Sequence, residues 1–230
     1  MHAAKYPNRS NNWSRIPALL SALRECQVVV YMDSDAIFPY LHLPMEWLLN
    51  YWNITEDIAV AMSQEPLDWH RKHWNITQDE LALLYPEPVL SWVAGLDSRG
   101  RTALNAGIMI VQNTPQTQEL LSRWMNCPTS DMYPGCHDLV NEWPAEQGAF
   151  NEYVRYDFLD RVHEIPCNEA HGYPGVSIGC YGTLLRHYTL DKMLVRGAVD
   201  DAALVKGAME ITQRSMVQER ADLYVNLPVL

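Results

Sequence analysis

The chain has 230 residues, of which 48% are apolar and 20% are charged, and its formal net charge is −11. This length and apolar content predict one folded domain and exclude a wholly disordered protein. The acidic balance argues against nucleic-acid binding, because such a surface repels phosphates. No apolar run approaches the ~18 residues that cross a bilayer, so we expect the chain as given to be soluble.

The first part of the chain predicts a helix, a strand and an acidic turn. Ile16–Glu25 spaces its apolar residues as a helix does. Val28–Met32 is a continuous β-prone run, typical of a central parallel strand that is covered on both faces. This strand leads directly into Asp33-Ser34-Asp35. A short helix at 44–52 and a strand at 58–62 are expected next.

The second part continues the alternation of strands and helices. Residues 64–104 are polar and proline-punctuated, and we expect an excursion in which Thr77–Glu80 forms a capping box at a helix start. Thr114 is the expected N-cap of the helix after the next strand. Strands are predicted at 104–111, 162–165 and 184–188, and helices at 115–125, 144–155 and 200–224. The pattern predicts an α/β fold with a mostly parallel sheet flanked by helices.

Two of the possible cysteine pairs bracket short loops. Cys127 and Cys136 enclose one loop, and Cys167 and Cys180 enclose the other. Neither spacing resembles a zinc knuckle. Disulfides that staple the loops suit an oxidising compartment, and buried free thiols are the equally open alternative.

Four Asn-x-Ser/Thr sequons, where chance predicts roughly one, favour passage through the secretory pathway. They lie at Asn8, Asn12, Asn53 and Asn75. The last sequon overlaps the capping box at Thr77, so a helix start explains it equally well.

The acidic turn after the first strand is the strongest chemical signal. Side chains at i and i+2 of an extended segment point the same way, so Asp33 and Asp35 can address one hard cation. The end of a strand is also where open α/β sheets bind ligands. A divalent ion there would neutralise a diphosphate. The competing interpretation is a turn in which Asp bonds the backbone.

Five segments in order resemble the GT-A nucleotide-diphospho-sugar glycosyltransferases, closest to the galactosyltransferase/mannosyltransferase-like group of fungal type. The run from Val28 to Phe38 resembles the DxD region of that family, and Leu104–Val111 resembles its "LNAGI" strand. A helix at 114–124 follows as expected. Trp143–Phe150 resembles the acidic-Gln helix start, and Leu185–Tyr188 resembles the late strand that ends in a metal-binding His. The resemblance spans roughly residues 15–195.

The resemblance implies a metal centre and phosphate partners. Asp33, Asp35 and His187 would hold Mn²⁺ or another divalent cation, and a neutral imidazole suits that ion. Lys192 would meet the leaving phosphate of a nucleotide diphosphate sugar, and Arg186 is the alternative partner. For a His on a strand, the structural alternative is a satisfied core residue.

The resemblance also implies a sugar site. Asn105 and Gly107 would line the donor sugar or the glycan acceptor. Glu146 would position sugar hydroxyls, and Gln147 would lie near the anomeric carbon. Relatives have Asp-Gln where this chain has Glu-Gln. A strand Asn that caps an edge, and an acid favoured by the helix dipole, are the structural alternatives.

The predicted function is a metal-dependent hexosyltransferase acting on a glycan acceptor. A non-catalytic carbohydrate-binding module and a metal-dependent hydrolase are the alternatives. In the family a strand–helix–strand unit precedes the DxD strand, so we interpret 1–230 as a single partial domain, with its core at 15–195 and a helical tail at 200–230. The expected location is the Golgi lumen, with a membrane anchor in the missing N-terminal region.

Overall fold

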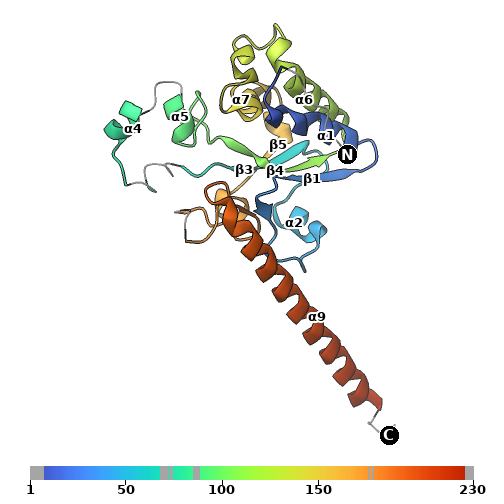
Figure 1. Cartoon of the computed structure of the whole chain (residues 1–230). Helices are drawn as coiled ribbons and strands as arrows, with labels where there is room; N and C mark the ends of the chain where they lie inside the picture. The colour runs from blue at the N-terminus through green and yellow to red at the C-terminus, as the bar shows by residue number, and fades with distance from the viewer. Residues whose placement is uncertain are drawn as a thin grey trace.

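A mixed sheet forms the centre of the fold (Figure 1). The computed structural model describes residues 8–67, 72, 75–84, 89–175, 177 and 179–225. In this part of the chain the main sheet has four strands in the order β1, β4, β3, β5. Their bounds are Val28–Met32 for β1, Leu104–Gln112 for β4, Val60–Gln64 for β3 and Val162–Ile165 for β5.

The prediction of a mostly parallel sheet is wrong. Strand β4 runs antiparallel to both β1 and β3, and only the pair of β3 and β5 is parallel. The reason lies in the connection between β3 and β4. It leaves and re-enters the same end of the sheet, where the N–H of Glu65 donates to the carbonyl of Ala103 at 2.8 Å. A chain that returns at the same end must reverse its direction.

Strand β1 also departs from its prediction. Its five residues are half-buried, and it lies at an edge of the sheet with β4 as its partner among the described strands. The continuous apolar run from Val28 therefore does not mark a central strand with both faces covered. The apolar surface of β1 instead packs partly against the two cores on either side of the sheet.

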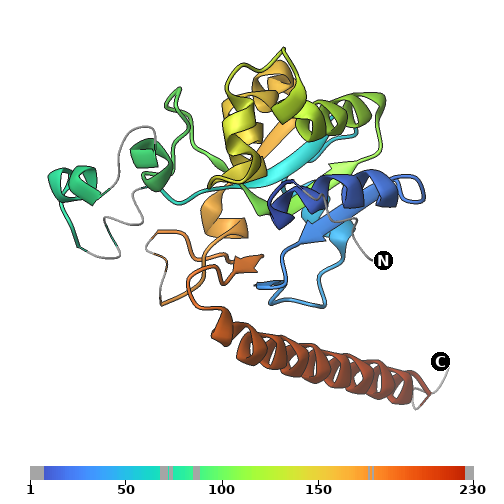
Figure 2. The same ribbon diagram turned by 45° about the horizontal axis from the view of Figure 1, so that its top comes forward.

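Helices cover both faces of the sheet (Figures 1 and 2). One core contains apolar residues of α1 (Arg15–Ala22), α6 (Pro115–Asn126) and α7 (Ala145–Glu152). The other contains residues of α2 (Met45–Tyr51) and α8 (Cys167–Ala170). Short 3-10 helices connect these elements at Asn11–Ser14, Cys127–Thr129, Cys136–Val140, Val154–Asp157, Leu159–Arg161 and Lys192–Leu194.

Local start signals in the sequence are confirmed. The Thr114 hydroxyl accepts from the N–H of Thr117 at 3.1 Å, as expected of the N-cap of α6. The capping box also forms, because the N–H of Thr77 donates to the Glu80 carboxylate at 2.7 Å and the N–H of Glu80 donates back to the Thr77 hydroxyl at 3.2 Å. The excursion contains α4 (Gln78–Leu84) and α5 (Val89–Val93).

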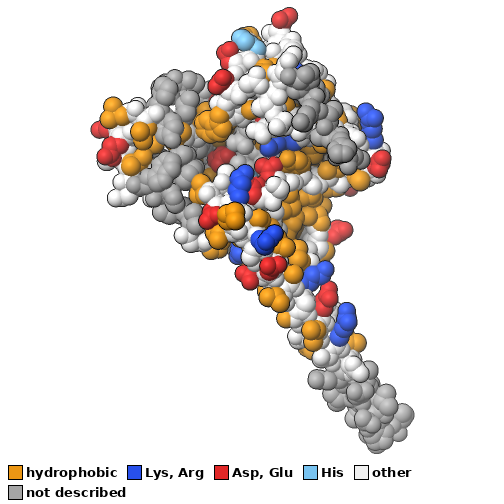
Figure 3. Space-filling view, viewed as in Figure 1, with side chains coloured by type: hydrophobic (Ala, Val, Ile, Leu, Met, Phe, Trp, Pro, Cys, Tyr) orange, Lys and Arg blue, Asp and Glu red, His pale blue; other side chains and the backbone are white. Residues whose placement is uncertain are grey.

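The C-terminal helix projects from the body of the molecule. Helix α9 (Val195–Val225) begins five residues before its predicted start. It packs through Val195 and Ala198 against a small cluster of Ile37, Tyr173 and Tyr188, and most of its large apolar side chains are exposed (Figure 3). The late strand is shorter than predicted. Strand β6 (Arg186–His187) pairs with β2 (Ala36–Ile37) in a separate two-stranded sheet.

The cysteines and sequons bear on the compartment. Cys127 and Cys136 form a disulfide, whereas Cys167 and Cys180 are free thiols. All four sequon asparagines are exposed. Asn53 and Asn75 have φ of 52°, a left-handed conformation that Asn tolerates, which gives these two a structural reason as well. Among the described helices, none combines the length and apolarity needed to traverse a bilayer.

Candidate functional site

The candidate site lies at the end of the sheet where β1 and β3 finish and β4 begins. The register places the carboxyl ends of β1 and β3 beside the first residues of β4. The N–H of Asp33 donates to the carbonyl of Gly107 at 2.7 Å, which fixes the acidic turn against β4. Open α/β sheets bind ligands at ends of this kind.

A histidine from far along the chain joins the two aspartates. In the pairing of β2 with β6, His187 lies opposite Ala36, the residue after Asp35. Its Nε2 is 3.3 Å from Oδ1 of Asp35 and 3.8 Å from Oδ2 of Asp33. One ligand atom from each of the three residues lies within 4.8 Å of the others, and the described residues contain no second group of this kind. Two carboxylates and an imidazole fit a divalent ion, so these residues could hold a metal.

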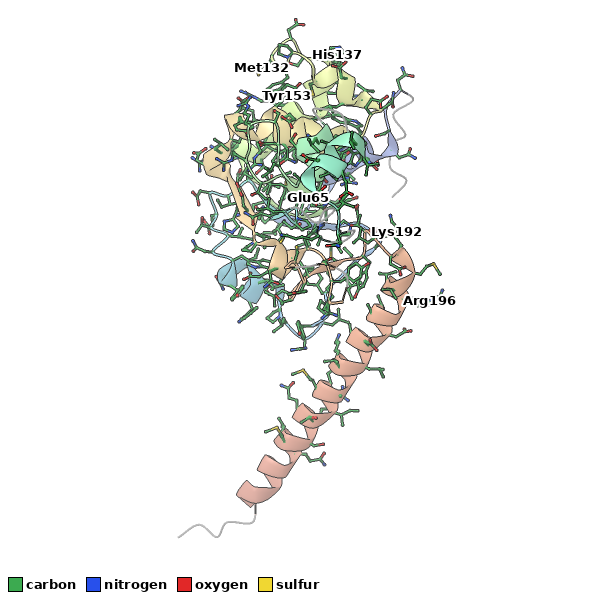
Figure 4. The ribbon with its side chains drawn as sticks, turned by 90° about the vertical axis from the view of Figure 1, so that its left-hand side faces the viewer. Glu65, Met132, His137, Tyr153, Lys192 and Arg196 are labelled. Atoms are coloured by element: carbon green, nitrogen blue, oxygen red, sulfur yellow. A yellow bond between two sulfur atoms is a disulfide. The ribbon has the colours of Figure 1, made fainter. Side chains whose placement is uncertain are left out.

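Two basic side chains accompany these carboxylates. Nζ of Lys192 is 2.9 Å from Oδ2 of Asp35, and Nη2 of Arg15 is 3.5 Å from Oδ1 of Asp33. Hydrogen bonding to His187, with help from Lys192, holds the pKa of Asp35 well below its usual range despite burial. Lys192 stands at the base of α9 (Figure 4). Asp35 is therefore ionised, and the ammonium of Lys192 partly neutralises its charge.

Arg186 is the predicted phosphate partner that the fold does not bring to this group. It precedes His187 on β6, and successive strand residues point to opposite faces. Its side chain is half-buried, and its Nε has no hydrogen-bond partner. Within the described structure no ion pair joins it to Asp33 or Asp35.

Glu65 forms the second centre of the site and directly follows β3 (Figure 4). Its Oε1 accepts from Nδ2 of Asn105 at 2.8 Å and from Nε2 of Gln147 at 2.9 Å. Its Oε2 is 3.3 Å from Nε2 of His171. Burial raises the pKa of Glu65, but the bonds to His171, Asn105 and Gln147 outweigh it and lower the pKa to about 2.

The two centres meet through the histidines. The rings of His171 and His187 are in edge-to-face contact, with centroids 5.3 Å apart. Both rings are buried, and Nδ1 of each lacks a protein partner. His171 therefore links the Glu65 network to the metal-binding candidate His187.

Asn105 and Gly107 shape the site from β4. Oδ1 of Asn105 accepts from the N–H of Gly107 at 2.7 Å, so the amide is bonded at both of its ends. A Cβ on residue 107 would lie 2.3 Å from Cε1 of His187. Gly107 is therefore the residue against which the His187 ring packs, and only glycine leaves room for that ring.

Gln147 and Glu146 enter from the first turn of α7. Oε1 of Gln147 accepts from the N–H of Ala106 at 2.9 Å, which complements its bond to Glu65. Glu146 is 1% exposed, and Oε1 of its carboxyl lies 3.2 Å from Nη1 of Arg15. Burial raises the pKa of Glu146 to about 7, although Arg15 opposes the shift. This acid therefore titrates near neutral pH.

Sequence reasoning missed Arg15, Glu65 and His171. Glu65 carried a usable signal, because it lies shortly after the strand predicted at 58–62, whereas Asp33 directly follows its predicted strand. Arg15 opens a helix and His171 lies in a glycine-rich loop, and neither belongs to a recognisable pattern. Only the fold brings them to the site.

Comparison with known proteins supports the fold. No protein-family model matches the sequence, and no curated protein matches it as a relative. Two solved structures match with a TM-score of 0.50. One is a glycosyltransferase involved in glycosylation of the major capsid of PBCV-1, at 12% identity, over 84% of this chain and 78% of that one. The other is the bifunctional glycosyltransferase WbbM, at 15% identity, over 92% of this chain and 38% of that one.

These likenesses show the fold alone. The chain has an α/β fold that resembles the GT-A glycosyltransferases, with a mixed sheet. It spans well under half of the WbbM structure. The fungal subgroup remains a prediction.

Proposed function

We propose that the chain is a metal-dependent glycosyltransferase domain that moves a hexose from a nucleotide diphosphate sugar to a glycan acceptor. The observation that carries this proposal is the convergence of Asp33, Asp35 and His187 beside the network centred on Glu65. A glycosyltransferase-like fold supports it.

The charged groups divide the work at the diphosphate. Mn²⁺ or another divalent ion, bound by Asp33, Asp35 and His187, would neutralise the diphosphate and favour its departure. Lys192 lies on Asp35 with its side chain 71% exposed, so its ammonium can turn to the leaving phosphate as a point charge. Arg186 takes no part in this proposal.

The amides form the sugar end of the site. Glu65 accepts one hydrogen from each amide nitrogen of Asn105 and Gln147, which orients both and leaves each a second hydrogen for a sugar hydroxyl. Gln147 would lie near the anomeric carbon. Arg15 orients the Glu146 carboxyl, which would hold donor hydroxyls. Gly107 leaves room for the His187 ring, and it would also make the sugar contact expected for it.

The proposed compartment is the Golgi lumen. The disulfide between Cys127 and Cys136 and the exposed sequon asparagines support a lumenal location. Removal of attached N-glycans from the secreted or membrane-expressed protein, followed by mass measurement, tests it.

The test is metal and donor binding by calorimetry. Mn²⁺ alone should bind, and a nucleotide diphosphate sugar should then bind only with Mn²⁺ present. Asp35→Asn should weaken Mn²⁺ binding by more than about 100-fold, because it removes a ligand charge. Asp160→Asn is the matched control, since that side chain is 76% exposed and paired with Arg161.

Other outcomes would replace the proposal. Glycan binding without nucleotide would indicate a carbohydrate-binding module, and phosphate-ester turnover without a sugar acceptor would indicate a hydrolase. Equal Mn²⁺ affinity in the parent, Asp35→Asn and Asp160→Asn would overturn the metal site.

A further inference from the structure

The loop between α8 and β6 is tied together at its base beside two cysteines. Asn168 follows Cys167 and Tyr181 follows Cys180, and the N–H of Tyr181 donates to Oδ1 of Asn168 at 3.3 Å. The N–H of Thr183 donates to the carbonyl of Asn168 at 2.8 Å. These bonds hold the two cysteine-bearing segments side by side.

The thiols themselves point into this junction. Sγ of Cys167 donates to the carbonyl of Gly179, the neighbour of Cys180, at 3.9 Å. Sγ of Cys180 donates to the carbonyl of His171 at 3.6 Å. When Cys167 is ionised, its sulfur can accept the single hydrogen of the Cys180 thiol in place of the His171 carbonyl. This hydrogen bond lowers the pKa of Cys167 and raises that of Cys180. Cys167 is partly exposed and Cys180 is buried, so the thiol with the lowered pKa is also the accessible one.

Glycines keep the junction close. Gly172 has φ of 66°, and a Cβ there would lie 1.9 Å from the carbonyl oxygen of Cys180. Gly182 has φ of 56°, and its Cβ would lie 2.5 Å from the carbonyl oxygen of Gly172. Both positions require glycine, so backbone packing as well as hydrogen bonding holds the Cys180 segment against the residues that follow α8.

We infer that Cys167 and Cys180 are a redox pair that closes into a disulfide across the base of this loop. The Cys167 thiolate attacks a small disulfide such as oxidised glutathione and releases one glutathione thiolate. The Cys180 sulfur, having lost its proton, then attacks the mixed disulfide and releases the second. Two protein thiols are oxidised, one glutathione disulfide is reduced to two thiols, and the two protons go to the glutathione.

The disulfide between Cys167 and Cys180 would act on the candidate site through His171. The carbonyl of His171 is bonded to the Cys180 thiol, and its ring lies on Glu65. The carbonyl of the next residue, Gly172, accepts from the N–H of His187 at 3.3 Å. Closing the loop would fix both histidines, and this consequence rests on the proposed function.

The first test measures the bond itself. The full chain with Cys26→Ser, which removes an exposed free thiol, is equilibrated with oxidised and reduced glutathione, alkylated and digested. Mass spectrometry should find peptides joined through Cys167 and Cys180 as well as through Cys127 and Cys136. The second pair is the internal control for oxidising conditions. Alkylation of both Cys167 and Cys180 while Cys127 and Cys136 stay joined would overturn the inference.

A matched variant tests the staple further. Cys167→Ser keeps a hydrogen-bonding group at the partly exposed position, so it should fold. In the oxidising buffer it should melt roughly 5–10 °C below the parent, because the closed loop is lost, and equal melting temperatures would count against the staple. If Cys167 and Cys180 are joined in the parent but Cys167→Ser binds Mn²⁺ with the same affinity as the parent, the disulfide is retained and its link to the site is overturned. If the parent protein itself does not bind Mn²⁺, that result would instead contradict the proposed function.

Discussion

The sheet end that holds the acidic turn and the outer part of α9 differ in how far each side chain is constrained. At the sheet end, Glu65 accepts from two amides and pairs with a histidine, and Gly107 has a ring against it. Along α9, Leu204 is 71% exposed and Ile211 is 68% exposed. Substitutions of the same kind should therefore change the stability of the protein much more at the sheet end than along α9.

The largest effect is expected at Glu65. In Glu65→Met the donors on Asn105, Gln147 and His171 lose their acceptor in a buried site, so the free energy of unfolding should fall by about 3 kcal/mol or more. Urea unfolding measures it. Glu210→Met on α9 is the matched control and should stay within about 0.5 kcal/mol. Similar losses in both variants would erase the distinction between the two regions.

Glu146 should make stability depend on pH. Its pKa is about 7 in the fold against an ordinary 4.5, so the folded state keeps a proton that the unfolded state has lost. Stability is then full below pH 4.5 and falls by up to roughly 3 kcal/mol as the pH rises to 7. Unfolding measured across this range should show a flatter profile in Glu146→Gln. A profile unchanged from the parent would mean that Glu146 is ionised throughout.

A pair of glycine substitutions should give effects of opposite sign. Gly107→Ala places a methyl 2.3 Å from His187, and we expect a loss of about 1–3 kcal/mol and roughly 10–100-fold weaker Mn²⁺ binding. Gly207→Ala on α9 meets open space and should gain about 0.5–1 kcal/mol. Thermal unfolding and calorimetry measure both. A neutral Gly107→Ala would show that the His187 ring does not need this position.

Local features of the fold were predictable from the sequence, whereas strand directions were not. The Thr114 cap and the capping box at Thr77 depend on residues three apart, so their signals lie within one turn of helix. The direction of β4 depends on where the excursion re-enters the sheet, at Ala103. The edge position of β1 depends on which strands pair with it. Neither property is written in a local pattern.

The site was predictable to the extent that its residues belong to motifs. The sequence pattern led to Asp33, Asp35 and His187, and the fold brings these together. It also led to Arg186, which precedes His187 on β6 and forms no ion pair with Asp33 or Asp35 in the described structure. Arg15 and Glu65 were missed because their partners are 131 and 82 residues away in the chain, at Glu146 and Gln147.

The start of β4 sets the spacing of the whole site. Asn151 bonds the backbone of Leu104, Gln147 bonds that of Ala106, and Asp33 bonds that of Gly107. Two side chains of α7 and the backbone of the acidic turn are thus hydrogen-bonded to a single stretch of backbone. An insertion or deletion of one residue here would turn Asn105 to the opposite face. It would also shift the turn relative to α7, so one change in length would undo contacts from three parts of the chain at once.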